Sequence, residues 1–362
     1  MIALPHAERV RLLGLTDPAA IEALRQAAFD RTSETVGDAV HYRGLVELSN
    51  RCTLDCHYCG IRRGNHDLAR YSLSPDEVIE AALFCAEAGY GSCVLQAGER
   101  RDEAFIGFVA EMVAEIRTRS RSERLPEGLG ITLSLGEQSL STYRRWREAG
   151  AHRYLLRIES SNPALFARLH PPEQRFETRL QALDDLRDAG FQVGTGVMIG
   201  LPGQTLDDLA ADIGFYGARD IDMIGMGPYL HSAGGTLPAS AMMAPEPLLT
   251  LALKMIAVTR LSLDGINIAA TTALQALVEN GREQGIAFGA NVTMPNATPR
   301  RVRRQYQLYD GKPCLDEGSL ECRGCLERRV TAAGRRVGWD QWGDSPHARR
   351  RLKTESFPGL LE

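Results

Sequence analysis

The sequence lacks long hydrophobic runs and any large excess of one charge. No stretch of its 362 residues approaches the roughly 18 apolar residues that cross a bilayer. The N-terminal stretch has no basic start followed by an apolar run and a small-residue cleavage site, as a signal peptide would. The net charge of -4 gives no general affinity for nucleic acid or anionic lipid. We therefore expect a cytoplasmic protein that binds neither nucleic acid nor membrane.

Low-complexity segments and long linkers are also missing, and the composition is that of a globular protein. A chain of this length buries a large core without disulfides. Six of its eight cysteines fall in two tight clusters, Cys52/Cys56/Cys59 and Cys314/Cys322/Cys325. In a reducing compartment, clustered thiols are metal ligands more often than bridges.

Short apolar runs of β type alternate with amphipathic helical patterns along most of the chain. Strands are predicted at 43–49, 91–99, 130–137, 152–160, 192–202, 221–229, 266–273 and 286–295. Helices are predicted at 74–90, 103–118, 139–149, 178–189, 205–218, 246–263 and 274–285. This alternation predicts an α/β fold with a parallel sheet, and eight strands can close into a (β/α)8 barrel of the TIM type. An open, doubly wound sheet is the alternative.

The pattern suggests three parts. Residues 1–40 are expected to form an N-terminal helical segment, and residues 41–295 the barrel. Residues 296–362 are rich in arginine, with helical or irregular patterns, and form a C-terminal extension that carries the second cysteine cluster.

The first cysteine cluster follows the first predicted strand, where loops of a parallel barrel form the catalytic face. Cys52, Cys56 and Cys59 offer three thiolates from one compact loop, and soft thiolates select zinc, copper or iron–sulfur clusters. A structural zinc site needs four ligands, and His57 is the available fourth. A 4Fe–4S cluster held by three thiolates instead leaves one iron open for substrate.

The spacing Cys52-x3-Cys56-His57-Tyr58-Cys59 resembles the signature of the radical S-adenosylmethionine (SAM) superfamily. The resemblance implies that the three cysteines hold a catalytic 4Fe–4S cluster and that SAM binds the open iron. It also implies reductive cleavage of SAM to methionine and a 5′-deoxyadenosyl radical, with ferredoxin or flavodoxin as the electron donor.

Polar residues near the ends of the predicted strands are the candidates for binding SAM. Arg157 and Glu159 are either a mutual pair or ligands of a charged guest, and the charged groups of SAM favour the second interpretation. The predicted SAM-binding residues are Tyr58, Gln96, Thr132, Ser134, Arg157, Glu159, Arg179 and Met226. The residues expected to face the substrate cavity are Arg153, Thr271, Thr272, Met294, Tyr306 and Tyr309.

Longer phrases narrow the resemblance. "YCGIRRGNHDLARYSLSPDEV", "VLQAGE", "RYLLRIESSNP", "MIGLPGQT" and "QLYDGKPC" together resemble the FeFe-hydrogenase maturase family HydE, over roughly residues 40 to 325. The family implies assembly of the hydrogenase active-site cluster together with partner maturases. It implies an organometallic iron–cysteine substrate, and an auxiliary 2Fe–2S or 4Fe–4S cluster at Cys314, Cys322 and Cys325.

Two features keep alternatives open. Where family members are expected to carry a His between the arginine and glutamate of the fourth strand, this chain has Ile158. A mutase similar to methylornithine synthase, acting on an amino acid, is the alternative enzyme. A non-catalytic iron–sulfur or zinc scaffold is the alternative of another class. A biotin synthase is disfavoured, because the predicted strands at 130–137 and 192–202 carry no cysteine for an inner cluster.

Overall fold

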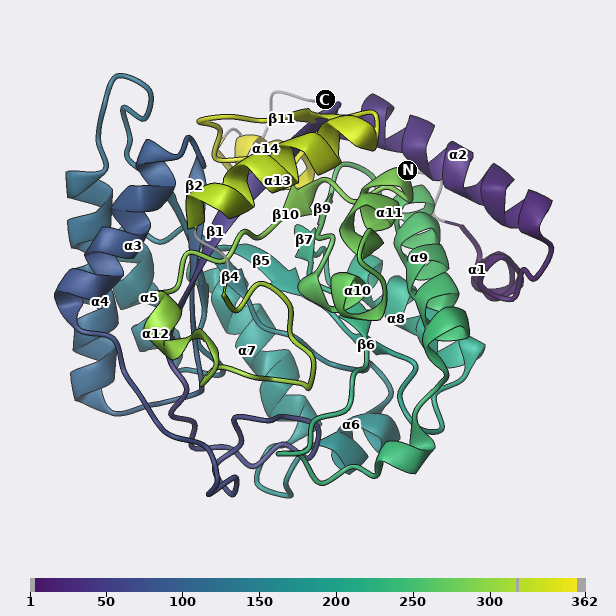
Figure 1. Cartoon of the computed structure of the whole chain (residues 1–362), viewed down its shortest axis with the longest axis horizontal. Coiled ribbons are helices and arrows are strands. Elements are labelled where there is room, and N and C mark those ends of the chain that lie inside the picture. The colour runs from purple at the N-terminus through teal and green to yellow at the C-terminus, as the bar shows by residue number, and fades with distance from the viewer. Residues whose placement is uncertain (1–3, 317–318, 357–362) are drawn as a thin grey trace.

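The computed structural model describes residues 4–316 and 319–356, and Figure 1 shows their arrangement. Two helices, α1 and α2, lead into strands and helices that alternate along the chain. The helices are α1 (His6–Leu13), α2 (Pro18–Thr35), α3 (Pro75–Glu87), α4 (Glu103–Arg119), α5 (Leu140–Glu148), α6 (Pro163–Leu169), α7 (Phe176–Asp188), α8 (Leu206–Ala218), α9 (Pro245–Ser262), α10 (Thr272–Leu277), α11 (Gly281–Ala287), α12 (Arg300–Arg303), α13 (Ser319–Ala332) and α14 (Pro346–Ser356). The strands are β1 (Ala39–Ser49), β2 (Ser92–Ala97), β3 (Gly130–Ser134), β4 (Arg153–Leu155), β5 (Gln192–Thr195), β6 (Met198–Ile199), β7 (Met223–Ile224), β8 (Gly227–Pro228), β9 (Asn267–Ile268), β10 (Val292–Thr293) and β11 (Arg336–Val337).

The sheet confirms the predicted barrel. Its strands follow the order β10-β1-β2-β3-β4-β5-β7-β9, and the neighbouring pairs are parallel. A parallel bridge between Ala269 and Val292 brings the two ends of this order together. Helices surround the strands and cover their outer faces, while the inner faces turn to the interior of the barrel. Accordingly, every residue of β1 is buried.

The first barrel helix, α3, begins where its sequence predicts. The Ser74 side chain accepts a hydrogen bond from the Glu77 backbone at 3.3 Å, and Glu77 accepts one from the Ser74 backbone at 2.9 Å. Pro75 occupies the first helical turn, where its missing N–H costs nothing. The interactions form the capping box expected from the sequence.

Several strands are shorter than predicted. The predicted strand at 152–160 is reduced to β4, and beyond it only an isolated parallel bridge joins Glu159, with φ +64°, to Val197. The predicted strand at 192–202 is divided into β5 and β6. The division lies at Gly196, where a Cβ would stand 2.2 Å from the carbonyl oxygen of Gly225. Close backbone contact therefore interrupts a run that looks continuous in the sequence.

Predictions near the end of the barrel, and one helix before its middle, also differ from the structure. The predicted strand at 286–295 begins inside α11 and is reduced to β10. The predicted helix at 274–285 is two short helices, α10 and α11, and the sequence analysis missed α6 altogether. In α6, Asn162 accepts a hydrogen bond from the backbone of Ala164 at 2.9 Å, and Pro163 follows this cap.

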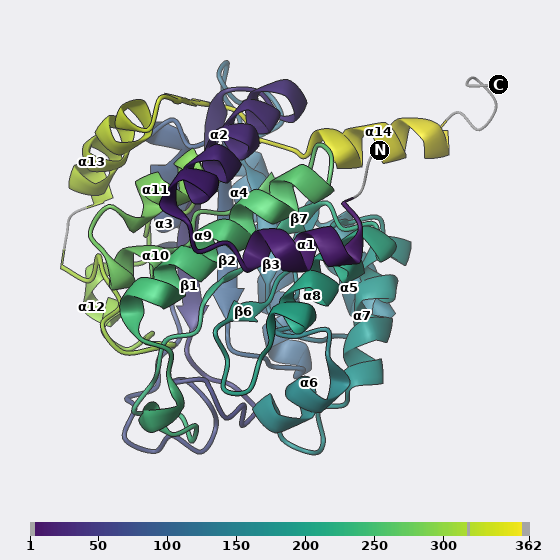
Figure 2. The ribbon, with the colours of Figure 1, turned by 90° about the vertical axis from the view of Figure 1, so that its right-hand side faces the viewer.

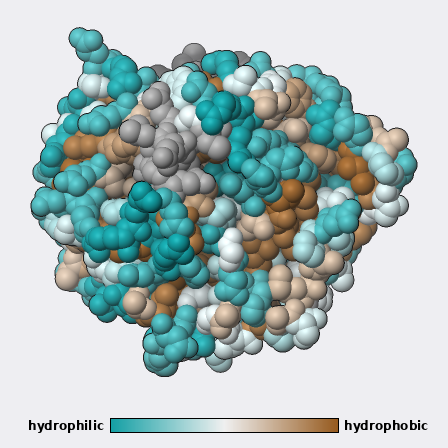
Figure 3. All heavy atoms as spheres, viewed as in Figure 1, coloured by the Kyte–Doolittle hydropathy of each residue, from teal (hydrophilic) through white to brown (hydrophobic). Residues whose placement is uncertain are grey.

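The N-terminal helices lie against one side of the barrel. Figure 2 shows α1 and α2 over α8 and α9, and contacts join α2 to α9 and α1 to α8. No helix in the described part of the chain combines the length and the apolar character needed to cross a membrane. The face in Figure 3 is largely hydrophilic, interrupted by a few hydrophobic areas.

The C-terminal segment closes the end of the barrel at which the strands begin. β11 pairs with the start of β1, and Figure 1 shows this segment at the top of the view, with α13 and α14 beside it. Asn267 donates to the carbonyl oxygen of Gly343 at 2.8 Å. Arg153, which is fully buried, donates to the Trp342 carbonyl at 2.8 Å and to the Asp344 carboxylate at 2.5 Å. Burial opposes ionisation of Asp344, but His152 and Arg153 outweigh it and hold its pKa well below the usual range.

The variant Asp344→Asn should destabilise the fold by about 3 kcal/mol, because it leaves the Arg153 guanidinium buried without its carboxylate. Urea unfolding at neutral pH measures the change in the free energy of unfolding. Asp340→Asn is the matched control, since Asp340 lies in the same segment and pairs with the exposed Arg124; it should cost less than about 1 kcal/mol. Equal losses in the two variants would contradict the importance of the buried pair.

Candidate active site

The cysteine loop, residues 50–65, begins where β1 ends. Thr53 donates its backbone N–H and its hydroxyl to the carbonyl oxygen of Glu99, at 2.9 and 3.0 Å, and so ties the loop to the end of β2. Gly98 permits this approach, because a Cβ there would lie 2.5 Å from the carbonyl oxygen of Arg51. The loop therefore occupies the face at the carboxyl ends of the strands, where barrel enzymes have their active sites.

Arg70 holds this loop in shape. Its guanidinium donates to the carbonyl oxygens of Asn50 at 2.6 Å, Ile61 at 2.8 Å and Arg62 at 2.5 Å, and to that of Asn65 at 3.0 Å. The N–H groups on the two terminal nitrogens of this side chain add to the few backbone hydrogen bonds that the loop makes within itself. Sequence reasoning missed Arg70, because no spacing pattern distinguishes it from the other arginines nearby.

The three predicted thiols are withdrawn from solvent. Cys56 is 8% exposed, and Cys52 and Cys59 are half-buried. Burial raises the pKa of each thiol, to about 12 for Cys59, and the charges of neighbouring cysteines raise the pKa values of Cys56 and Cys59 further. Three thiolates at this place need compensating positive charge, which the irons of a cluster supply. The donor set therefore fits an iron–sulfur cluster.

His57, the fourth ligand of the zinc alternative, does not join these thiols. Its Nδ1 atom lies 2.8 Å from the hydroxyl oxygen of Thr236. Within residues 4–316 and 319–356, no three His, Cys, Asp or Glu side chains gather as ligands of a single metal ion.

A cavity of about 330 Å³ extends from the thiols into the barrel. This volume lies within the range of small-molecule sites. Most of the predicted site residues contribute to its wall: Cys52, Cys56, Tyr58, Cys59, Gln96, Thr132, Ser134, Arg157, Glu159, Arg179, Thr271, Thr272, Met294, Tyr306 and Tyr309. Segments far apart in the sequence thus meet at one space, as the barrel prediction requires.

Two predicted site residues lie elsewhere. Arg153 was expected to face the substrate cavity, but its guanidinium points to the opposite end of the barrel and pairs with Asp344. It stands at the start of β4, so its side chain belongs to the closed end. Met226 was expected to contact SAM, but it is fully buried in the hydrophobic core, with its sulfur 4.0 Å from the Thr259 hydroxyl.

Arg157 and Glu159 form an ion pair that leaves polar atoms free for a guest. The Arg157 Nη2 atom lies 2.9 Å from the Glu159 Oε2 atom. The orientation is not that of a hydrogen bond, so these two atoms and Arg157 Nε are buried without hydrogen-bond partners. Tyr58 donates its hydroxyl to the other Glu159 oxygen at 3.4 Å. Such unsatisfied buried groups fit the amino and carboxylate groups of SAM.

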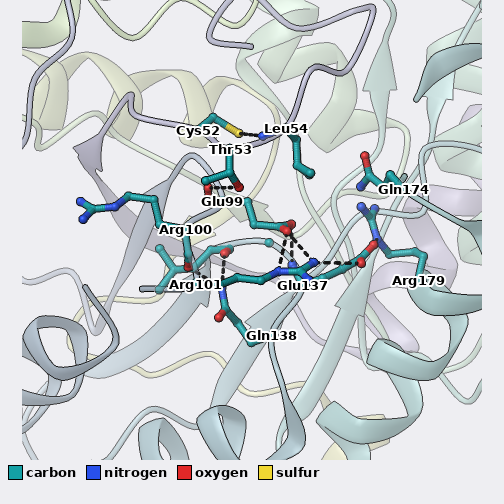
Figure 4. A network of polar contacts seen from close by, with 12 residues as sticks. Cys52, Thr53, Leu54, Glu99, Arg100, Arg101, Glu137, Gln138, Gln174 and Arg179 are labelled. Atoms are coloured by element: carbon teal, nitrogen blue, oxygen red, sulfur yellow. Dashed lines mark hydrogen bonds and ion pairs between the residues drawn. The ribbon is translucent and has the colours of Figure 1, made fainter. Parts of the chain in front are cut away.

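Arg179 is held by a network of carboxylates that Figure 4 shows. Its Nε atom donates to Glu137 at 2.6 Å, and Glu99 accepts the Glu137 backbone N–H at 2.8 Å. Arg101 bonds Glu99 at 2.7 Å from the other side. Burial disfavours the charge of Arg179, but Glu137 and Glu99 outweigh it and raise the pKa of the guanidinium. Arg179 is thus a fixed cation on the cavity wall.

Glu99 and Glu137, the partners of Arg179 in this network, were not among the site residues predicted from the sequence. The available signal was the repeated Gly–Glu dipeptide after β2 and β3. A second ion pair on the cavity wall, between the ammonium of Lys312 and the carboxylate of Glu47, was also not predicted from the sequence. Burial raises the pKa of Glu47, and Lys312 opposes this shift. A charged residue inside the predicted strand was the signal for Glu47.

Ile158, the departure from the expected family pattern, does not reach the cavity. Its side chain is fully buried in the hydrophobic core, and its backbone N–H donates to the Thr195 hydroxyl at 3.0 Å. A residue at this position can therefore influence a ligand only through the backbone that carries Arg157 and Glu159.

The second cysteine cluster is only partly visible. Cys314 is half-buried, with its sulfur 3.9 Å from Arg282 Nη2. Cys322 and Cys325 belong to α13, and their side chains lie outside the described residues.

Comparison with known proteins agrees with this geometry. The radical SAM superfamily matches residues 46–215. The [FeFe] hydrogenase maturase subunit HydE of Thermotoga maritima is 41% identical over 332 residues, which cover 91% of this chain and 91% of that protein. Methylornithine synthase (PylB) has a similar structure, with a TM-score of 0.78 and 22% identity over 93% of this chain and 95% of that one. The maturase HydG of Carboxydothermus hydrogenoformans gives a TM-score of 0.79 and 21% identity over 97% and 79%.

The two structural likenesses show the fold alone, whereas the likeness to HydE extends over nearly the whole of both proteins. In this chain, a barrel carries a three-cysteine loop at the carboxyl ends of its strands, and a cavity lies beside the thiols. The chain is therefore a radical SAM enzyme and belongs to the HydE family of [FeFe]-hydrogenase maturases.

Proposed function

We propose that this enzyme helps to build the active-site cluster of an [FeFe] hydrogenase, acting on a small iron–cysteine species that carries carbonyl and cyanide. The observation that carries the proposal is the 41% identity to a HydE protein over 91% of the chain. The cavity that adjoins the three thiols supports it, because both reactants need a shared, water-poor space.

In the proposed reaction, Cys52, Cys56 and Cys59 would hold a 4Fe–4S cluster. When bound, that cluster would supply the one electron that reductive cleavage of the S–C5′ bond of SAM needs, which gives methionine and a 5′-deoxyadenosyl radical. Arg157 and Glu159 hold the charged amino-acid end of SAM, while Arg179 keeps their surroundings positive.

The substrate would occupy the remaining part of the cavity. Thr271, Thr272, Met294, Tyr306 and Tyr309 line the wall there. The hydroxyl oxygen of Thr271 is buried without a hydrogen-bond partner, so it is available to a polar group of the substrate. Aromatic and thioether side chains beside it would exclude water and limit side reactions of the radical.

Further parts of the proposal concern the partners, the location and the second cysteine cluster. The electron would come from a ferredoxin or flavodoxin, and the substrate from a partner maturase, in the cytoplasm. Cys314, Cys322 and Cys325 would hold an auxiliary 2Fe–2S or 4Fe–4S cluster. Arg282, beside Cys314, supports this site because a nearby cation favours a thiolate.

The central test is activation of an apo-hydrogenase by the reconstituted protein together with its partner maturases. We expect the unmodified enzyme to restore hydrogenase activity and the triple variant Cys52→Ala, Cys56→Ala, Cys59→Ala to lose both activation and 5′-deoxyadenosine formation. Cys85→Ala is the control, since Cys85 is buried in α3 outside the triad. SAM cleavage without hydrogenase activation would reject the maturase assignment and retain the radical chemistry.

Replacing Cys322 and Cys325 by Ala should lower the iron content while SAM cleavage continues, because the auxiliary cluster is proposed to lie outside the catalytic cavity. Iron analysis and 5′-deoxyadenosine yield are the measurements. A variant with unchanged iron content would contradict the auxiliary cluster, and one without SAM cleavage would contradict its independence from the cavity.

Arg157→Gln and Glu159→Gln should each weaken SAM binding by about 2 kcal/mol, or roughly 30-fold, through loss of a charge-assisted hydrogen bond. Equilibrium dialysis of the iron-loaded protein measures this affinity. Arg175→Gln and Glu177→Gln are matched controls, because this pair has the same spacing but is 70% exposed on both sides. Unchanged SAM affinity in the Arg157 and Glu159 variants would return these residues to a structural role.

A further inference from the structure

The turn after β4 holds Glu159 in an unusual conformation. Its φ of +64° lies in the region that favours glycine, so the surrounding structure must impose it. Part of the constraint comes from the next strand segment: Glu159 N–H donates to the Gly196 carbonyl at 3.0 Å, and Met198 N–H donates to the Glu159 carbonyl at 3.0 Å. These bonds fix one side of the turn only.

Helix α8 fixes the other side. Ser161 donates both its backbone N–H and its hydroxyl to the same carboxylate oxygen of Asp212, at 2.7 and 2.6 Å. One helical turn earlier, Asp208 accepts a hydrogen bond from the Asn162 side chain at 2.7 Å. Two carboxylates of one helix therefore hold the two residues that follow the turn, immediately beyond Ser160.

The burial of the Asp212 carboxylate is energetically unfavourable, and packing alone does not explain it. It is fully buried, and within residues 4–316 and 319–356 no Arg, Lys or His is among the groups that shift its pKa. Its second carboxylate oxygen has no hydrogen-bond partner. Burial raises the pKa of Asp212 to about 7, against the effect of the Ser161 hydrogen bonds. Apolar residues would fill this place at lower cost, so the carboxylate is retained for what it holds.

We infer that Asp212 is a positioning residue for SAM: by fixing Ser161 it holds the left-handed turn that turns Glu159, with Arg157, toward the cavity. The inference rests on the proposed use of Arg157 and Glu159 as SAM ligands. No residue of α8 is among those that line the cavity. The inference nevertheless gives α8 control over the affinity for an amino-acid sulfonium ligand. The Asn162 contact with Asp208 supports the same turn and starts α6.

The test compares Asp212→Val, which removes the acceptor, with Asp212→Asn, which keeps an oxygen for both Ser161 donors. In the iron-loaded enzyme we expect Val to weaken SAM binding about tenfold, and Asn to stay within about twofold of the unmodified protein. KM for SAM should rise in the Val variant while kcat for 5′-deoxyadenosine at saturating SAM is retained. Asp207→Val is the matched control, because Asp207 is an exposed carboxylate of the same helix.

Amide hydrogen exchange over residues 158–163 in iron-free protein gives a second readout that needs neither SAM nor activity. Exchange should rise in the Val variant and not in the Asn variant. If Asp212→Val fails to fold, Ser161→Ala replaces it; loss of the hydroxyl alone should weaken SAM binding about threefold.

Unchanged SAM affinity in the Val variant, with only a lower melting temperature, would overturn the inference. Equal losses in the Asn and Val variants would overturn it as well, since charge rather than hydrogen bonding would then matter. Failure of the unmodified iron-loaded protein to bind SAM would instead reject the proposed function, and the hydrogen-exchange result would still report whether Asp212 holds the turn.

Discussion

The hydrogen bonds of Arg70 to the carbonyl oxygens of the cysteine loop are the interaction on which the site depends. A cluster held by three thiolates requires those thiolates to come from a short loop, and a short loop cannot satisfy its own backbone. Arg70 supplies the missing donors from outside the loop, while Glu99 anchors it to β2. The loop can then keep its shape while its thiols stay buried beside the cavity. In this way a site for SAM chemistry is compatible with a stable barrel.

Much of the fold could be predicted from sequence, because the alternation of apolar runs and helical patterns reports which faces are buried. The end of a strand is set by contacts with partners that the pattern does not contain. Gly196 interrupts a predicted strand because the backbone of Gly225 lies against it. Another predicted strand keeps only β4 and a single bridge at Glu159, whose left-handed conformation has no local signal in a glutamate. The order of elements was therefore predictable, but their ends were not.

For the site, the sequence predicted which residues take part better than it predicted where their side chains point. The cysteine spacing and the polar strand ends led to most of the cavity wall. Arg153 shows the limit, because its identity and strand were correctly noted while its side chain turns to Asp344 at the opposite end. The direction depends on residues almost 200 positions away in the chain, and no local pattern reports it. Asp212 was missed for the same reason, since its partner Ser161 lies 51 positions away. Arg70 was missed although its partners are near in the chain, because no pattern distinguishes it from the arginines around it.

The cavity is completed at both ends by chain that follows the last barrel strand. At the carboxyl end, Gly60 donates to the Leu308 carbonyl at 3.0 Å and Lys312 pairs with Glu47, so the segment after β10 covers the space beside the cysteine loop. At the other end, Arg43 reaches from the cavity wall to the carbonyl oxygen of Gly343 at 3.1 Å. A radical intermediate needs an enclosed space, and the barrel strands alone leave both ends open. The C-terminal chain is thus part of the wall that encloses the cavity, whatever the role of its cysteines.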